Sequence, residues 1–440
     1  MGKLSLKNCC SFQEGYVNPT QKNRDYFDGP IKWLRASDLN DGLVYNTERT
    51  LSQLGFDSAG KSSFLFKPNT LAISKSGTIG RVGILKDFMC GNRAVINIDV
   101  NHNLCDLYYV FYTLKNKKLE IISKAGGSIQ KNLYISALET ITLNHSELHE
   151  QKKIAKVLSD LDAKIEVNNK INKELEAMAK TLYDYWFVQF DFPYDFEKGK
   201  PEVNGKPYKS SGGKMVYNKE LKRDIPEGWE VKEINKLIEV RDGTHDSPKS
   251  IAKGHKLITS KHLKPEGLDF NSANSISDED YLNINKRSKV DTGDILFSMI
   301  GNIGTVYKVD EENIDFAIKN VALFKTSESQ NLKNFIYMYL IGYDMQGYMA
   351  NVISGSIQKF IGLGSLRQIP LIYNEEIISN FNQITLPIFN QINTLKLENQ
   401  KLAELRDWLL PMLMNGQVSV GEAEKRLSMV AEERGKYGEL

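Results

Sequence analysis

The sequence predicts an α+β protein with an internal pseudo-two-fold repeat. Two globular domains with small mixed sheets are expected, separated by two long helices that pair as an antiparallel coiled coil. Three observations predict this class. The pentapeptide GSIQK occurs at residues 127–131 and again at 355–359. Two apolar strands around a G-x-I-G turn precede each copy, at 71–85 and 295–309, and each copy then runs into a long segment with apolar residues in heptads.

The repeat keeps its order and its spacing. The separation between Gly77 and Gly301 is the same as that between Gly80 and Gly304. With 440 residues, the chain also exceeds what one ordinary hydrophobic core organises. We therefore expect six segments: a first globular domain (1–147), a long helix (148–190), a linker rich in Gly, Pro, Lys and Ser (191–224), a second globular domain (225–373), a second long helix (374–415) and a tail (416–440).

The heptads predict which faces of the two helices meet. The residues expected to pair the helices are Leu161, Asn168, Leu175, Leu182, Leu395, Leu402 and Leu409. A buried Asn at position 168 would set the register of pairing at some cost in stability. A second column on the first helix, formed by Ile171, Met178 and Tyr185, is expected to be core as well.

Composition limits the class of protein. The 57 basic and 55 acidic residues leave a net charge of +2, so any contact with DNA must come from locally clustered charge or be shared with a partner. No apolar run is long enough to span a bilayer, and the N-terminus lacks the apolar core of a secretory signal. The four cysteines form no Cys-x-x-Cys pair. We expect a cytoplasmic protein with reduced thiols and no metal site.

The sequence lacks the common catalytic signatures. It has no G-x-x-x-x-G-K-[ST] phosphate loop, no dinucleotide fingerprint, no H-E-x-x-H and no Asn/Asp-Pro-Pro-aromatic tetrapeptide. His145 and His149 stand near a helix start and are more typical of solvated surface than of metal ligands. The stretch DGTH at 242–245 is more typical of a turn or a polar contact than of acid–base chemistry. The chain is predicted to be non-catalytic.

The repeated turns and loops suit contact with DNA. A G-x-I-G turn lets the backbone approach a ligand closely, although a plain hairpin turn explains it equally well. Gln and Lys side chains contact base edges or phosphates, although a solvated loop is the alternative. The candidates in and beside these two motifs are Lys75, Ser76, Arg81, Gln130, Lys131, Ser298, Asn302, Gln358 and Lys359.

With these motifs in view, the sequence resembles the specificity subunit of a type I restriction-modification system. The resemblance covers nearly the whole chain. It rests on two domains that carry G-x-I-G and GSIQK, on the helix start HEQKKIAKVLSDLDAKI, on the helix end K-x-L-Y-x-Y-W-F, and on IPEGWE at 225–230. The first domain lacks an IPEGW of its own, and the second helix lacks the Glu-Gln start.

The resemblance implies a function. Each target-recognition domain would read one half of a bipartite sequence in double-stranded DNA, and the helical rod would set the spacer. Two modification subunits would dock on the helices, and restriction subunits would join the complex. The chain itself would bind no cofactor, since S-adenosylmethionine, ATP and Mg²⁺ would belong to the partner subunits.

Residues shared by both domains cannot encode two different half-sites, so we expect GSIQK to position the DNA backbone. Base reading is expected from residues that differ between the copies, namely Asn18, Thr20, Lys22, Arg24, Thr244, His245 and Lys249. Two other classes stay open on the sequence. One is a non-catalytic coiled-coil adaptor with two protein-binding heads, and the other is an enzyme with unusual motifs.

Overall fold

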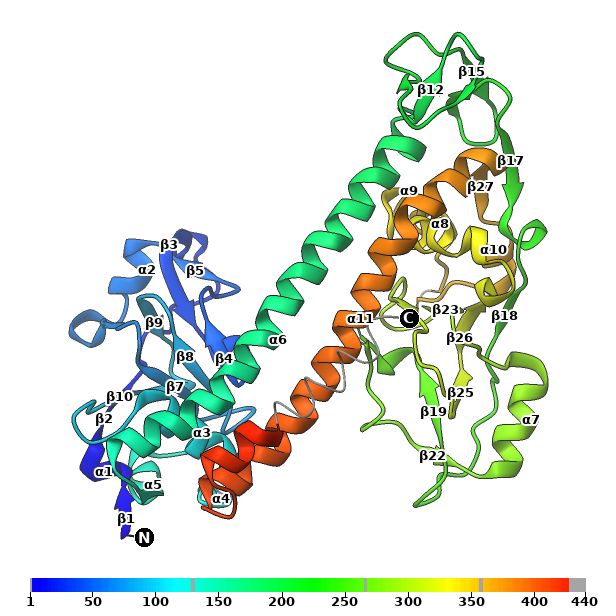
Figure 1. The fold of residues 1–440 in the computed structure, drawn as a ribbon. Coiled ribbons are helices and arrows are strands. Elements are labelled where there is room, and N and C mark those ends of the chain that lie inside the picture. Colours follow the sequence, from blue (N-terminus) through cyan, green and yellow to red (C-terminus); the bar gives the residue numbers. More distant parts are fainter. Residues whose placement is uncertain (1, 128–130, 265–266, 356–358, 427–440) are drawn as a thin grey trace. The chain divides into compact units, whose positions relative to one another are not determined.

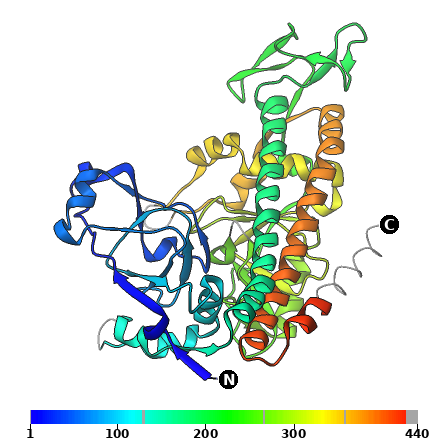
Figure 2. The ribbon, with the colours of Figure 1, turned by 60° about the vertical axis from the view of Figure 1, so that its left-hand side comes forward.

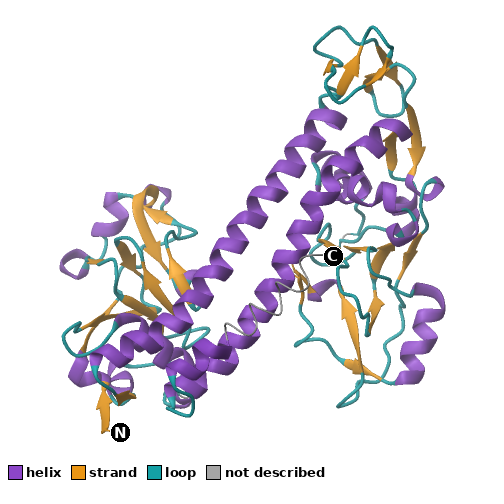
Figure 3. Cartoon of the chain, viewed as in Figure 1, coloured by secondary structure: helices purple, strands orange, loops and turns teal. Residues whose placement is uncertain are grey.

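The computed structural model describes residues 2–127, 131–264, 267–355 and 359–426 (Figure 1). The chain divides into two compact units. Unit 1 comprises residues 1–168 and 398–440, and unit 2 comprises residues 169–397. Each unit therefore contains one sheet domain and a part of both long helices, α6 (Leu148–Tyr183) and α11 (Glu375–Met414). Helices and strands are mixed within each unit, which confirms the predicted α+β class (Figure 3).

Unit 1 is built around a five-stranded sheet in the order β2-β10-β7-β8-β4. Its strands are β2 (Cys10–Glu14), β10 (Val95–Val100), β7 (Leu71–Ser74), β8 (Val82–Leu85) and β4 (Gly42–Val44). A second sheet has the order β5-β3-β9-β6, with β5 (Thr50–Leu51), β3 (Phe27–Leu34), β9 (Met89–Gly91) and β6 (Leu65–Phe66). A separate pair joins β1 (Gly2–Ser5) to β11 (Thr142–His145). The helices of this domain are α1 (Leu6–Cys9), α2 (Gln53–Asp57), α3 (Leu107–Asn116), α4 (Lys118–Ser123) and α5 (Ile135–Glu139).

Unit 2 repeats most of this topology, with four strands in place of five in its main sheet and three in place of four in its second sheet. Its main sheet has the order β18-β26-β23-β24, with β18 (Val240–Asp242), β26 (Val321–Phe324), β23 (Ile295–Ser298) and β24 (Val306–Lys308). The parallel pair β3·β9 of unit 1 recurs as β19 (His255–Thr259) with β25 (Phe316–Lys319), flanked by β22 (Ser275–Ile276). The pair β1·β11 recurs as β17 (Glu230–Glu233) with β27 (Pro370–Tyr373). The helices are α7 (Asp278–Ser288), α8 (Gln330–Ile341), α9 (Tyr343–Val352) and α10 (Leu363–Arg367). The strand–turn–strand predicted around each G-x-I-G is confirmed as β7–β8 and β23–β24.

The predicted linker is folded. It forms a three-stranded sheet of β13 (Lys200–Pro201), β12 (Pro193–Asp195) and β14 (Lys206–Pro207), followed by the hairpin of β15 (Met215–Asn218) and β16 (Arg223–Pro226). Aromatic rings pack within this segment and against IPEGWE: Phe192 stacks on Tyr208, with ring centroids 4.7 Å apart, and on Trp229, with centroids 5.2 Å apart. Trp229, the Trp of IPEGWE, therefore packs the folded linker against the start of the second domain.

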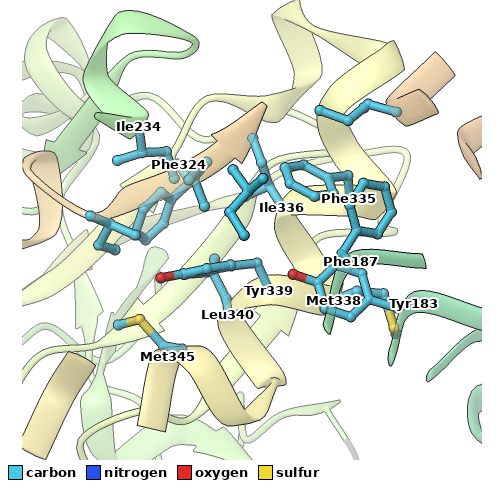
Figure 4. Packing of buried hydrophobic residues seen from close by; sticks show 14 of the residues in the cluster. Tyr183, Phe187, Ile234, Phe324, Phe335, Ile336, Met338, Tyr339, Leu340 and Met345 are labelled. Atoms are coloured by element: carbon cyan, nitrogen blue, oxygen red, sulfur yellow. The ribbon is translucent and has the colours of Figure 1, made fainter. Parts of the chain in front are cut away.

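The core of unit 2 lies where α6 ends (Figure 4). Phe187 and Phe335 have ring centroids 4.8 Å apart, and Tyr183 lies beside both. Phe381 of α11 packs edge-on against Phe187. The aromatic residues of K-x-L-Y-x-Y-W-F thus join the helix pair to the sheet domain, because large rings bury much apolar area.

Asn168 joins α6 to α11 in unit 1. Its side chain is fully buried, and its amide donates to Oδ1 of Asn399 at 2.9 Å and to Oε2 of Glu398 at 3.1 Å. In this unit, segments of the two helices lie side by side (Figure 2). Of the other residues predicted to pair the helices, Leu161, Leu395 and Leu409 are buried, and Leu175, Leu182 and Leu402 are partly buried.

The prediction for the second column of α6 is wrong. Ile171, Met178 and Tyr185 are 41%, 58% and 39% exposed. The buried positions are instead those of Asn172 and Ala179. A polar and a small residue occupy the inward face, so a count of apolar residues points to the wrong side of the helix.

Candidate nucleic-acid interface

The G-x-I-G turn of unit 1 lies next to the residues that flank GSIQK. The loop is closed at its base by a bridge between Gly126 and Asn132, whose backbone groups exchange hydrogen bonds of 3.0 and 2.7 Å. The following residue, Leu133, donates its N–H to the carbonyl of Lys75 at 2.8 Å. Since Lys75 opens the turn after β7, two motifs that are separate in sequence form one surface feature.

The same arrangement recurs in unit 2. Ser354 and Phe360 close the second loop through bonds of 3.0 and 2.9 Å, and Ile361 donates to the carbonyl of Met299 at 3.0 Å. Met299 follows β23 as Lys75 follows β7. We call each such combination the turn–loop pair.

The turns require their first glycine for its backbone conformation. Gly77 and Gly301 have φ values of 71° and 74°, and a Cβ at either position would have open space within 4 Å. The left-handed region therefore demands glycine here, without any close neighbour. Inside each turn the hydroxyl of a buried serine donates to a backbone carbonyl: Ser74 Oγ donates to Thr78 at 2.5 Å, and Ser298 Oγ donates to Ile300 at 3.1 Å.

Ser298 is therefore a correction to the predicted contact residues. It is fully buried, and its hydroxyl is used within its own turn. A hydroxyl without exposed surface cannot reach DNA, so Ser298 supports the turn instead.

A second shared feature is an acid–Gly corner after the first strand of each main sheet. Glu14 is the last residue of β2 and Asp242 is the last residue of β18, and each is followed by a glycine, Gly15 or Gly243. A Cβ on Gly15 would lie 2.2 Å from the carbonyl oxygen of Asn92, and one on Gly243 would lie 2.3 Å from that of Ile318. Only glycine permits this close backbone approach, and it recurs at the same place in both units.

The corner of unit 2 carries a polar cluster. Asp242 is 5% exposed, and its Oδ1 accepts from Nη2 of Arg287 in α7. Its Oδ2 lies 3.0 Å from Nε2 of His245, and Nδ1 of His245 lies 2.8 Å from Oδ1 of Asn320. Asn320, in the turn between β25 and β26, has a φ of 53°. We call Asp242, His245, Arg287 and Asn320 the Asp242 cluster.

Two hollows flank the Asp242 cluster. One, of about 540 Å³, is lined by Glu239, Arg241, Asp242, Lys286, Arg287, Leu363 and Arg367. The other, of about 200 Å³, is lined by residues of the 244–248 loop and of α7, and Arg287 lines both. A hydrogen bond from Arg241 lowers the pKa of Glu239. The first hollow thus holds more cationic than anionic side chains.

Unit 1 places different chemistry at the same corner. Glu14 Oε2 accepts from Nζ of Lys75 at 2.8 Å, with both side chains largely buried. The guanidinium of Arg49 lies 4.2 Å from the ring centroid of Phe27 and donates to Oε1 of Gln21. The two units thus share a scaffold but differ in the polar groups that it presents.

Apart from the buried Ser298, the predicted contact residues fall into three groups. Exposed residues are Asn18, Thr20, Lys22, Arg24, Lys131, His245, Lys249, Asn302 and Lys359. Half-buried residues are Lys75, Ser76, Arg81 and Thr244. Gln130 and Gln358 lie outside the described residues. In unit 1 the turn–loop pair brings Lys75, Ser76 and Lys131 into one region.

Sequence reasoning missed Arg287, Asn320 and Arg49. Arg287 is 45 residues from the Asp242 that it contacts, and it ends a helix whose polar residues look like a solvated face. The only available signal was Asp-Gly after an apolar strand in one copy and Glu-Gly in the other. That signal marks the corner, but it does not identify the partners.

Across the described ranges, no group of three or more His, Cys, Asp or Glu side chains is placed to hold a metal ion. The four cysteines are free thiols. A hydrogen bond with Cys10 raises the pKa of Cys9 to about 12, and burial raises that of Cys90 to about 12. In the same described part of the chain, every helix is too short or too polar to cross a membrane.

Comparison with known families decides which protein class uses this arrangement. The family described as "Type I restriction modification DNA specificity domain" matches twice, at residues 4–177 and 226–406. The chain belongs to this family. Its two matched stretches coincide with the two copies of the repeat. As a member of this family, the chain is a DNA-specificity subunit and not an enzyme.

Relatives of this specificity family span the whole chain. The type I restriction enzyme MjaIX specificity subunit of Methanocaldococcus jannaschii is 26% identical over 421 residues, covering 93% of this chain and 91% of the relative. The HindI specificity subunit of Haemophilus influenzae is 21% identical and covers 73% of this chain and 79% of the relative. The crystal structure of the type I restriction-modification S subunit of M. genitalium has a TM-score of 0.52 at 14% identity, with 94% and 95% of the two chains covered. That similarity confirms the fold.

Proposed function

We propose that the two globular domains of this specificity subunit each read one half of a bipartite target in double-stranded DNA. One observation carries the proposal. The same strand order and the same turn–loop pair occur twice, while the acid–Gly corners beside them carry Lys75 in one unit and Arg287 with His245 in the other. A common scaffold with different polar groups is what two unlike half-sites require, because base edges differ in their donor and acceptor patterns.

The shared residues suit the DNA backbone. Lys131 and Lys359 are exposed at the ends of the two GSIQK loops, and phosphate contacts carry no sequence information. We assign base reading to positions that differ between the copies. These are the exposed residues around 18–24 in the first domain and 244–249 in the second.

We further propose that α6 and α11 pair as an antiparallel coiled coil that sets the spacer between the half-sites. In unit 1, Asn168 pairs with Asn399 while Asp162 pairs with Arg406, so positions that rise along α6 meet positions that fall along α11. The domain limits are proposed at 1–147, 148–190, 191–224, 225–373, 374–415 and 416–440.

The exposed column of α6 supports docking of partner subunits. Ile171, Met178 and Tyr185 form one apolar face, which suits the packing of a further helix. We propose that two modification subunits bind the helices and that restriction subunits complete the complex, all in the cytoplasm. S-adenosylmethionine, ATP and Mg²⁺ would bind those partners.

The test is the methylome of cells that contain this chain and its neighbouring methyltransferase, compared with cells in which only this chain is deleted. Loss of one bipartite adenine-methylation motif supports the proposal and reveals both half-sites and the spacer. An unchanged methylome contradicts it and would favour a coiled-coil adaptor, which the family membership does not favour. The adaptor also predicts no salt-dependent binding of duplex DNA.

A further inference from the structure

We propose that Arg287 reads a guanine in the half-site of the second domain, and that Asp242 and His245 are positioning residues that hold its guanidinium in place. This inference rests on the proposed function and names residues within it. It concerns one base in one half-site, so it can fail while the proposed function stands.

The guanidinium of Arg287 is held in place before any DNA binds. Asp242 is almost fully buried, and both of its carboxylate oxygens are occupied, one by Arg287 and the other by His245. A buried carboxylate with two charge-assisted or polar partners has little freedom to move. Asp242, at the end of β18, therefore anchors the guanidinium of Arg287 from α7, although the side chain of Arg287 is 60% exposed.

Arg287 keeps N–H donors that its bond with Asp242 does not use. Among the contacts of the described residues, Arg287 uses only Nη2, with Asp242 as acceptor. A guanidinium has five N–H donors in a planar fork, so an edge of the fork stays available. A planar pair of donors matches O6 and N7 of guanine in the major groove, which is the commonest specific contact of arginine with DNA.

His245 differs from Arg287 in that both of its ring nitrogens are already engaged. Both ring nitrogens of His245 already face oxygen atoms, Oδ2 of Asp242 and Oδ1 of Asn320. The imidazole thus braces the corner, and its nitrogens are not directed at a ligand. His245, one of three predicted base readers in this loop, thus becomes a support for Arg287, while Thr244 and Lys249 keep the proposed reading role.

The position of Arg287 also suits a reader. Arg287 lines both hollows beside the corner, so open space adjoins its side chain. Arg241 and Lys286 line the larger hollow and add positive charge there. Cations around a directed arginine draw the phosphate backbone close, which brings a base edge within its reach.

The comparison of the two units supports the assignment. At the equivalent corner of unit 1, the acidic residue is Glu14, and its partner Lys75 is only 17% exposed. The ammonium group of Lys75 is paired with Glu14 and is less exposed than the guanidinium of Arg287. The same scaffold therefore pairs the corner carboxylate with an ammonium group in the first domain and with a guanidinium in the second, and the two half-sites should differ at this point.

The experiment uses the full chain in complex with its methyltransferase subunit and determines the methylated motif by sequencing. Arg287→Ala should relax one position, a guanine, in one half-site, with discrimination at that position falling by on the order of tenfold or more. Asp242→Asn should relax the same position. Arg287→Lys should retain a weakened preference, since lysine keeps a donor but loses the fork.

The matched control is Lys286→Ala, which removes the same charge from the neighbouring residue of α7. It should weaken binding to all sequences and leave the motif unchanged. An unchanged motif in Arg287→Ala, or relaxation in both half-sites, overturns the inference. If the alanine variant does not fold, Arg287→Lys decides, because full retention of the guanine preference would contradict a bidentate contact. A wild-type complex that yields no bipartite motif refutes the proposed function itself.

Discussion

Replacing Asp162 by Asn tests how the first domain is joined to the helices. Asp162 lies on α6, where its Oδ2 accepts from the hydroxyl of Tyr112 at 2.7 Å and its Oδ1 accepts from Nη1 of Arg406 at 2.7 Å. Lys115 Nζ lies 3.9 Å away, and burial lowers the pKa of Lys115. One carboxylate thus connects α3, α6 and α11 within unit 1.

The magnitude follows from these two hydrogen bonds. A hydrogen bond to a charged group contributes about 1.5–3 kcal/mol. The side chain of Asp162 is 28% exposed and that of Arg406 is 20% exposed, so water compensates part of any loss. Asparagine keeps one acceptor oxygen but loses the charge and the second acceptor, so we expect Asp162→Asn to reduce the free energy of unfolding of unit 1 by about 1.5–3 kcal/mol. Tyr112→Phe should reduce it by about 1.5 kcal/mol, with a coupling near 1 kcal/mol in the double mutant.

Hydrogen exchange read by mass spectrometry suits this test, because it reports the two units separately. Protection should fall in α3 and in the first half of α6, while peptides of unit 2 stay unchanged. Asp160→Asn is the control, since Asp160 pairs with Lys156 at 2.6 Å on the same helix but both side chains are more than half exposed. Its cost should stay below about 0.5 kcal/mol. Equal costs for the two variants, or additive effects of Asp162→Asn and Tyr112→Phe, would refute the reasoning.

Three further predictions concern single side chains. Asn168→Ala should lower the free energy of unfolding by about 1–2 kcal/mol in urea denaturation, because it removes the buried bonds between the helices; no change would show that water replaces them. Gly301→Ala should lower the free energy of unfolding by about 1–2 kcal/mol through its φ alone. Gly243→Ala should lower it more, because its Cβ would lie 2.3 Å from a backbone oxygen. The reverse order of urea midpoints would contradict these two geometries. Burial lowers the pKa of Lys308 below its ordinary 10.5, so the unfolded chain binds more protons in the interval between the two values and stability rises with pH there. Lys308→Met should flatten that rise in unfolding measured across alkaline pH, and an equally steep rise would assign the effect to other groups.

The repeat and its strands could be predicted because their causes are local. Gly77 and Gly301 mark turns that only glycine adopts without strain, and the short apolar segments on both sides of each turn predict paired strands. The long helices could be predicted for the same reason, since heptads recur without Gly over the whole of α6. The second column of α6 could not, because Asn172 and Ala179 carry no apolar signal although both face inward.

The sequence by itself determined the doubled architecture, the two long helices, the glycine turns and the resemblance to specificity subunits. These depend on periodicity, on backbone conformation and on motif order, all of which are properties of neighbouring residues. Only the tertiary structure decided that Ser298 is buried, that the residues flanking GSIQK bond to the G-x-I-G turn, and that Arg287 meets Asp242. Such contacts join segments that become neighbours only when the sheet forms and the helices pack on it, and no local pattern encodes which side chains then face each other.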